Sequence, residues 1–237
     1  MALESFVDGL HCKYENNGKQ PLILIHGLAM DKDSWHYQYE FFKHDYNLIS
    51  YDLRGHGRSL PKQSYTLDDF VNDLKKIKNY FCVENEIVMG FSLGGTIALK
   101  YAEQNNIKKL VTINSPYHPL MIKPSFLLKY VVARNVPKTF ISAELDNEPV
   151  WKYKNRLNTH RKCFVNANIK EIDKIIWTMI RNVPKVNLPD CDKLMIYSQN
   201  DEIVKPPKDE HVLIKGGHHY VIAQKYEEVN KIIKKFL

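Results

Sequence analysis

The chain has few cysteines, and they are far apart. They are Cys12, Cys82, Cys163 and Cys191. Neither a Cys-x-x-Cys spacing nor the cysteine density of a small secreted scaffold is present, so the sequence argues against a disulfide framework. We expect reduced structural thiols in a cytoplasmic protein.

Long apolar runs are also absent. A membrane-spanning helix needs roughly 18 or more consecutive apolar residues, and even the run Phe126–Leu128 is followed at once by Lys129. The first residues, Met1–Asp8, carry two acids and no basic residue, unlike the start of a signal peptide. We therefore expect neither a membrane span nor a signal peptide.

Acidic residues are outnumbered, since 34 Lys and Arg against 27 Asp and Glu give a net charge of +7. Most of the basic residues are lysines spread along the chain, which favours a biased genome composition over a binding patch. Only the segment with Lys234 and Lys235 approaches a charge run, and it is typical of a solvated helix face. We expect no nucleic-acid partner; binding to nucleic acid or to a membrane surface would instead depend steeply on salt.

Short apolar runs alternate with helical patterns along the chain. The pair Asp8-Gly9 separates two extended segments and is typical of a type I′ turn, so we expect the chain to open with an antiparallel hairpin. Six further runs have the apolar character of buried strands. They are Pro21–His26, Tyr46–Tyr51, Glu86–Met89, Lys109–Ile113, Lys193–Tyr197 and His211–Ile214.

The helical patterns complete the predicted architecture. Thr66 to Asp69 resembles a capping box, and an apolar stripe follows it up to Phe81. The alternation predicts one α/β domain over residues 1–237, with a mostly parallel central sheet and helices on both faces. It stops between about 117 and 187, where we expect an inserted helical cap. We interpret the stripe from Ile172 to Val183 as packing of this cap onto the sheet domain rather than as a pocket lining.

Ser92 stands in the most informative pattern of the chain, Gly90-Phe91-Ser92-Leu93-Gly94. An apolar strand-like run precedes this pattern and a helical one follows it. A sharp strand-to-helix turn lifts a serine hydroxyl clear of the sheet, and small residues at 90 and 94 let the backbone close. We therefore predict that Ser92 is a nucleophile.

A serine hydroxyl needs a base that accepts its proton and a third group that orients the base. Asp201 follows the strand-like run ending at Tyr197, and we predict it as the orienting acid. We favour His218 as the base, because the two glycines before it let the loop carry an imidazole over the sheet. His219 is the alternative base. A metal role for the His pair lacks further ligands at suitable spacing.

The oxyanion formed on an attacked carbonyl needs backbone N–H donors. We predict that the Leu93 amide, next to Ser92, supplies one of them. The Leu28 amide is predicted as the second, because Leu28 lies in the loop that leaves the strand-like run ending at His26. In this interpretation His26 supports the loop and is not the base.

Five motifs follow one another in a characteristic order. They are His26-Gly27-Leu28, Asp52 to Ser59, Gly90 to Gly95, Asn200-Asp201 and Gly217-His218. In this order they resemble the signature of the α/β-hydrolase superfamily, over nearly the whole chain outside the expected cap. The resemblance implies an α/β-hydrolase fold, ester hydrolysis through an acyl-enzyme, and a structural role for the loop Asp52–Ser59 at the rim of the site. The short segment between Asp201 and His218 predicts a turn around Pro206-Pro207 in place of a helix.

The sequence therefore predicts a serine hydrolase, a carboxylesterase that acts on small or medium acyl esters at a pocket between sheet and cap. No cofactor and no metal are implied, and no oligomeric state is predicted. Hydrolysis of thioesters, lactones, amides or carbon–carbon bonds, and perhydrolysis, use a similar triad, and the fold does not choose among them. A ligand-binding protein without turnover is a further alternative, which labelling of Ser92 by a fluorophosphonate would distinguish.

Overall fold

The computed structural model describes residues 2–134, 168–181 and 185–237. An eight-stranded sheet forms its centre, with the strand order β1-β2-β4-β3-β5-β6-β7-β8. The strands are β1 (Leu3–Val7), β2 (Leu10–Tyr14), β3 (Pro21–Ile25), β4 (Asn47–Tyr51), β5 (Ile87–Phe91), β6 (Lys109–Ile113), β7 (Lys193–Ser198) and β8 (Val212–Ile214). The pairs from β4 to β8 are parallel, whereas β1–β2 and β2–β4 are antiparallel, so the predicted mostly parallel sheet is confirmed.

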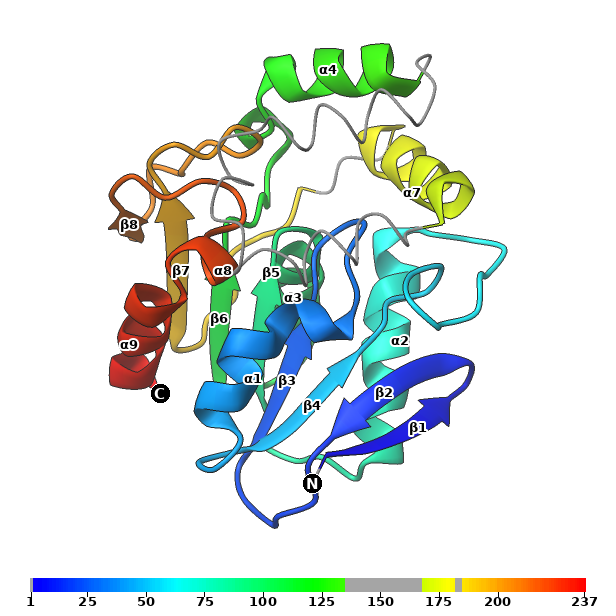
Figure 1. The fold of residues 1–237 in the computed structure, drawn as a ribbon, viewed down its shortest axis with the longest axis vertical. Coiled ribbons are helices and arrows are strands. Elements are labelled where there is room, and N and C mark those ends of the chain that lie inside the picture. The colour runs from blue at the N-terminus through cyan, green and yellow to red at the C-terminus, as the bar shows by residue number, and fades with distance from the viewer. Residues whose placement is uncertain (1, 135–167, 182–184) are drawn as a thin grey trace.

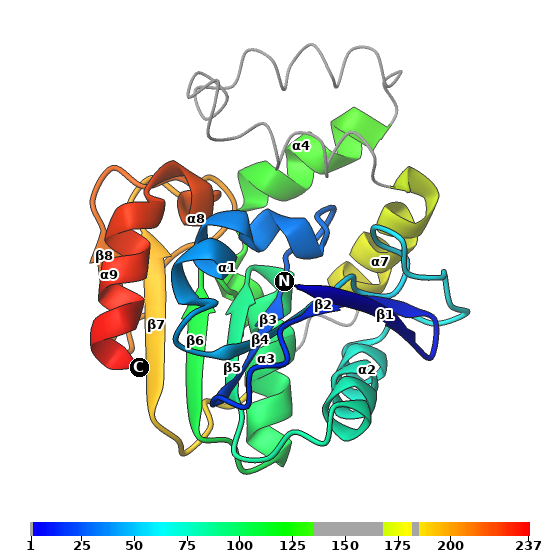
Figure 2. The same cartoon turned by 60° about the horizontal axis from the view of Figure 1, so that its bottom comes forward.

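The first two strands form the expected hairpin. Asp8 and Gly9 both have positive φ, 49° and 79°, as a type I′ turn requires at its two central positions. The register pairs Val7 with Leu10 on either side of the turn. Figure 2 shows this hairpin at one edge of the sheet and β8 at the opposite edge.

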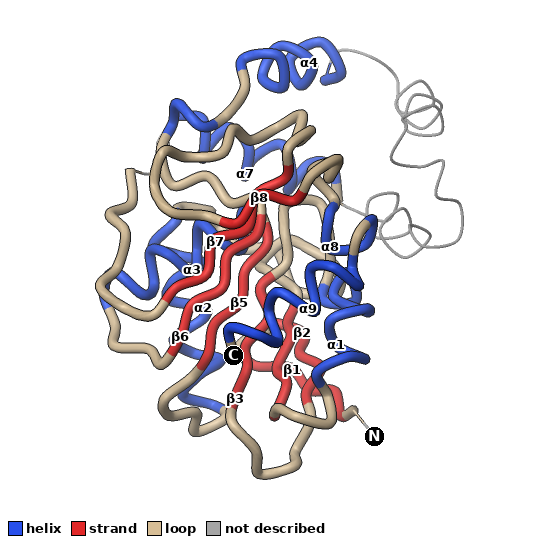
Figure 3. The backbone as a smooth tube through the Cα atoms, turned by 90° about the vertical axis from the view of Figure 1, so that its left-hand side faces the viewer, coloured by secondary structure: helices blue, strands red, loops and turns tan. Residues whose placement is uncertain are grey.

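Helices cover both faces of the sheet, as predicted. Figure 3 shows α2 and α3 on one side and α1, α8 and α9 on the other. The helices are the 3-10 turns η1 (Lys32–Trp35) and η2 (Pro119–Met121) and the α-helices α1 (His36–Phe42), α2 (Leu67–Tyr80), α3 (Leu93–Gln104), α4 (Pro124–Arg134), α7 (Ile169–Arg181), α8 (Val221–Gln224) and α9 (Tyr226–Phe236).

The core explains this layering. Successive side chains of a strand point to opposite faces, so in β3 Ile23 packs with α2 and α3 while Leu24 packs with α1 and α9. Both are almost fully buried, and burying one such side chain stabilises the fold by about 1.5–3 kcal/mol. Helix α2 starts at the predicted capping box, where Thr66 and Asp69 exchange side-chain-to-backbone hydrogen bonds.

The described residues between β6 and β7 hold η2, α4 and α7, which in Figure 1 lie beyond the carboxyl ends of the parallel strands. Ile172, Ile175 and Ile176 of α7 are buried in the same cluster as α2 and α3, so the predicted packing onto the sheet domain is confirmed for these three. The remainder of the expected cap, 135–167 and 182–184, lies outside the described residues, and its extent stays a prediction.

The segment between β7 and β8 is the expected helix-free loop, with Pro206 and Pro207 in it. Among the described residues, no helix combines the length and apolar character needed to cross a membrane. Cys12, Cys82 and Cys191 are free thiols, and Cys163 lies outside the described residues.

Candidate active site

Ser92 occupies the turn between β5 and α3, as predicted. Its φ is +51° and its ψ is −119°, a left-handed conformation that is unfavourable for a residue with a Cβ. The Ser92 N–H donates to the Ile113 carbonyl at 2.9 Å, while the Ser92 carbonyl accepts from Gly95 and Thr96 of α3. The backbone strain at Ser92 is therefore held by hydrogen bonds on both sides.

The glycines around Ser92 are required by close backbone approach. A Cβ added to Gly90 would lie 2.3 Å from the Gly94 carbonyl oxygen, and one added to Gly94 would lie 2.1 Å from that of Ile25. Real Cβ atoms do not come this close to backbone oxygens. The two glycines therefore let α3 begin directly against the ends of β5 and β3.

The ring of His219 joins Ser92 to Asp201. Its Nε2 lies 3.1 Å from Ser92 Oγ, and its Nδ1 lies 2.8 Å from Asp201 Oδ2. An ionised carboxylate can only accept a hydrogen bond, so the His219 proton belongs on Nδ1. The lone pair of Nε2 then faces the serine hydroxyl, which is the arrangement in which an imidazole can accept its proton.

His218, the base that we favoured from the sequence, is not the histidine that contacts Ser92 and Asp201. Its ring Nδ1 lies 3.6 Å from Glu202 Oε2, and its side chain is 29% exposed. The His218 N–H donates to Gln224 Oε1. This contact holds the residue on the outer side of the loop, while the next residue turns inward. The alternative, His219, contacts Ser92 and Asp201.

Asp201 is buried, with only 2% of its surface exposed. Its Oδ1 accepts hydrogen bonds from the Ile203 and Val204 amides at 2.7 and 2.8 Å. Burial alone would raise the pKa of this carboxyl, but the charge of His219 and the hydrogen bonds from His219 and the two amides lower it below its usual value. The group is therefore an anion in the neutral pH range.

The loop after β3 approaches Ser92 closely. A Cβ on Gly27 would lie 3.3 Å from Ser92 Cβ, so the chain at Leu28 passes beside the nucleophile. Within the described part of the chain, neither the Leu28 nor the Leu93 amide has a hydrogen-bond acceptor. The N–H of Leu93 is among the first of α3, which helices leave unpaired. Both amides are thus available as hydrogen-bond donors, and their role at an oxyanion stays a prediction.

His26 supports this loop, as we interpreted it. The Leu53 N–H donates to His26 Nε2 at 2.9 Å, so the ring proton sits on Nδ1, which donates to the Gly27 carbonyl at 2.7 Å. Burial lowers the pKa of His26 to about 4. Both nitrogens of this neutral ring are hydrogen-bonded to the backbone, so His26 supports the loop and has no free nitrogen to act as a base for Ser92.

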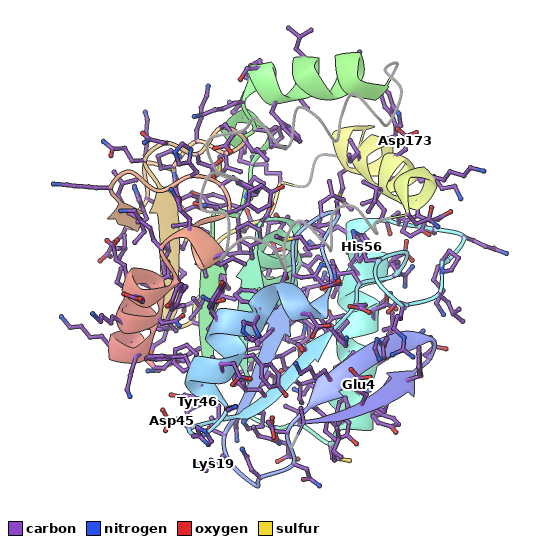
Figure 4. The ribbon with its side chains drawn as sticks, in the orientation of Figure 1. Glu4, Lys19, Asp45, Tyr46, His56 and Asp173 are labelled. Carbon is purple, nitrogen blue, oxygen red and sulfur yellow. The ribbon has the colours of Figure 1, made fainter. Side chains whose placement is uncertain are left out.

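The Asp52–Ser59 loop is held by its own polar contacts. Asp52 is buried and accepts from the backbone of Lys32 and Arg58, at 2.7 and 2.9 Å. Burial and the neighbouring His26 lower the pKa of His56 to about 3. Figure 4 shows His56 near the end of the sheet that faces α7. The contacts fit the structural role that we expected for the loop.

Within residues 2–134, 168–181 and 185–237, no three His, Cys, Asp or Glu side chains lie close enough together to hold a metal ion. The arrangement around Ser92 has instead the parts needed for acyl transfer. They are a hydroxyl on a strained backbone, an imidazole facing it, a buried carboxylate behind the imidazole, and two nearby backbone amides without an acceptor among the described residues.

Asn114 is a residue of this region that the sequence analysis missed. It directly follows β6, and its side-chain amide contacts the carbonyl of His219 at 2.7 Å. An asparagine at a strand end has no distinctive sequence signal, because turns use this residue frequently.

Comparison with known proteins agrees with the fold. The family described as alpha/beta hydrolase fold matches residues 20–219. A putative non-heme chloroperoxidase from Synechocystis sp. is 31% identical over 94% of each chain. Human Epoxide hydrolase 4 is 34% identical, but the alignment covers 47% of this chain and only 34% of the relative.

Solved structures show the same architecture. A thermophilic esterase from Thermogutta terrifontis superposes with a TM-score of 0.76, covering 100% of this chain and 97% of that one, at 19% identity. At that identity the likeness supports the fold alone. The family match, which spans most of the chain, decides the assignment: this chain belongs to the α/β-hydrolase fold family.

Proposed function

We propose that the protein is a serine carboxylesterase that cleaves small or medium acyl esters through an acyl-enzyme. The observation that carries this proposal is the line of contacts from Ser92 Oγ to His219 Nε2 and from His219 Nδ1 to Asp201. It connects a nucleophile, a base and an orienting acid in the roles that acyl transfer needs.

In the first half of the reaction, Ser92 Oγ bonds to the ester carbonyl carbon and its proton passes to His219 Nε2. The carbonyl oxygen becomes an oxyanion, which the Leu28 and Leu93 amides stabilise. When the tetrahedral intermediate collapses, the bond to the alcohol oxygen breaks, and His219 returns the proton to the leaving alcohol. Asp201 stays ionised and stabilises the charged imidazole in between.

In the second half, water attacks the acyl-enzyme with the same groups. His219 takes a proton from the water, the Ser92–acyl bond breaks, and Ser92 recovers its proton as the carboxylic acid leaves. This step requires a carbonyl in the intermediate. If Ser92 opened an epoxide, the product would be an ether without a carbonyl. The name of the human relative therefore does not transfer to a chain with serine at this position.

Perhydrolysis is the second candidate, because a relative from Acinetobacter calcoaceticus, 32% identical over 49% of this chain, is named a bifunctional esterase/perhydrolase. In this reaction hydrogen peroxide replaces water in the second half, and a peracid leaves in place of the acid. The same acyl-enzyme serves both outcomes. Adding hydrogen peroxide to the ester assay and measuring peracid separates them.

The test of the proposal is ester turnover together with labelling by a fluorophosphonate probe. We expect the protein to hydrolyse chromogenic esters and to bind the probe at Ser92, and a series of increasing acyl length to identify the preferred chain. Ser92→Ala should abolish both signals, whereas Ser50→Ala, which changes a buried serine within β4, should keep them. Absence of labelling in the folded parent protein would contradict the proposal.

A further inference from the structure

Asn114 has an unusual backbone. It is fully buried, and its φ is +47°, a left-handed conformation that asparagine tolerates better than most residues with a Cβ. Its N–H donates to the Ile196 carbonyl of β7 at 2.8 Å. The backbone of Asn114 is therefore fixed between the ends of β6 and β7, and this fixes where its side chain begins.

The orientation of the Asn114 amide follows from its partners. The Ser198 N–H can only donate, so the side-chain atom that it meets at 2.8 Å must be the carbonyl oxygen, Oδ1. The Nδ2 group then faces the His219 carbonyl at 2.7 Å and Ser198 Oγ at 2.9 Å, with the His218 carbonyl farther away at 3.3 Å. Both functional atoms of the amide are used.

The end of β6 thereby holds two parts of the proposed site. Ile113 accepts the Ser92 N–H at 2.9 Å, and Asn114, the next residue, holds the backbone of His219. The following residue is braced as well, because Tyr197 Oη donates to the Ser115 carbonyl at 2.7 Å. Two adjacent residues at the end of β6, Ile113 and Asn114, therefore fix the distance between Ser92 and His219.

The other backbone contact of His219 is weaker. The His219 N–H donates to Glu202 Oε2 at 3.3 Å, and the Glu202 side chain is 39% exposed. Water competes for such a carboxylate, whereas it does not reach the fully buried Asn114. The Asn114 amide is consequently the firmer anchor of the loop that carries His219.

We infer that Asn114 is a positioning residue for His219. It does not touch the reacting atoms; it fixes the His219 carbonyl so that the ring spans Ser92 and Asp201. This inference rests on the proposed role of His219 in proton transfer. A displacement of about 1 Å in a reacting group can cost about 100-fold in rate, so the loss of this anchor should affect turnover more than substrate binding.

Asn114→Asp is the sharpest test, because it keeps the shape and the tolerance for positive φ but turns the donor toward His219 into an oxygen. We expect kcat for a chromogenic ester to fall about 10- to 100-fold, with KM changed less than about threefold. The rate of fluorophosphonate labelling should fall in the same proportion. Asn114→Gly, which keeps the backbone conformation and removes the amide, carries the test if the aspartate variant does not fold.

Asn230→Asp is the matched control. Asn230 is also buried, and its amide joins Gln38 to the Tyr37 carbonyl on the α9 side of the sheet. The same chemical change there should lower stability without lowering kcat per folded molecule. A loss of kcat equal to that of the Asn114 variants would show that any buried defect has this effect, and would overturn the inference.

Proton NMR gives a readout that does not need a substrate. The Nδ1 proton between His219 and Asp201 should give a far-downfield resonance, which we expect to move or disappear in Asn114→Asp and to stay in Asn230→Asp. If the parent protein neither hydrolyses esters nor binds the probe, the proposed function fails, and this resonance alone decides the role of Asn114. An unchanged resonance, kcat and labelling rate in folded Asn114 variants would overturn the inference.

Discussion

Replacing Asp201 by asparagine should reverse the proton arrangement at His219 while leaving the fold in place. In the parent protein Oδ1 of Asp201 accepts from two backbone amides, Ile203 and Val204, and Oδ2 accepts from His219. An asparagine has one carbonyl oxygen to offer. Two amide donors outnumber one ring donor, so the oxygen should stay at the backbone and the NH₂ group should face His219.

The energetic bias for this orientation is considerable. The opposite orientation would point an NH₂ group at two buried N–H groups, and each unsatisfied buried donor costs about 1–3 kcal/mol. With NH₂ facing it, His219 Nδ1 must accept, so its proton moves to Nε2. That nitrogen then presents N–H to Ser92 Oγ, 3.1 Å away in the parent protein, and has no lone pair to accept the serine proton.

We expect kcat to fall about 10⁴-fold, as in other triads whose base is held in the wrong tautomer. That factor corresponds to about 5.5 kcal/mol of lost transition-state stabilisation. The assay is hydrolysis of a chromogenic short-chain ester near neutral pH, with circular dichroism to show that the variant is folded. Asp209→Asn, at an exposed carboxylate bonded to Tyr117, is the control and should retain turnover. A folded Asp201→Asn enzyme within tenfold of the parent would refute the reasoning.

Three further outcomes follow from the same geometry. His219→Ala should lose several orders of magnitude in ester turnover, whereas His218→Ala should lose less than about tenfold; the opposite ranking would return the role of base to His218. Gly94→Ala should lower the free energy of unfolding in urea by about 3 kcal/mol, because the new Cβ meets the Ile25 carbonyl oxygen. The pKa of Asp201 is lowered by folding, so its stabilising contribution is complete above the unfolded pKa of about 4 and is lost as pH falls through the lower folded value. Urea titrations of parent and Asp201→Asn should therefore converge toward acid pH.

Much of the fold could be predicted because its signals are local. Each buried parallel strand needs a short apolar run, and all six runs are strands whose bounds agree to within about two residues. The Asp8-Gly9 turn and the Thr66 capping box depend on the chemistry of a few adjacent residues. Ser92 was predictable for the same reason, since the glycines that its turn requires are its sequence neighbours.

The contacts of Asn114 were not predictable in this way. They join the end of β6 to Ser198 and to His219, residues far along the chain that meet only after the sheet has formed. No local pattern distinguishes an asparagine that anchors a distant loop from one that simply ends a strand.

The choice between His218 and His219 shows where local reasoning fails. Two acid–histidine pairs lie side by side: Asp201 with His219, and Glu202 with His218. Asp201 and His219 are buried, whereas the side chains of Glu202 and His218 are partly exposed, yet the sequence is nearly symmetric between the two pairs. Burial breaks the symmetry. A carboxylate can be buried only where hydrogen bonds replace its water, and the amides of Ile203 and Val204 provide these bonds to Asp201. The acid that the backbone can solvate turns inward, and its histidine partner is then the one that meets Ser92.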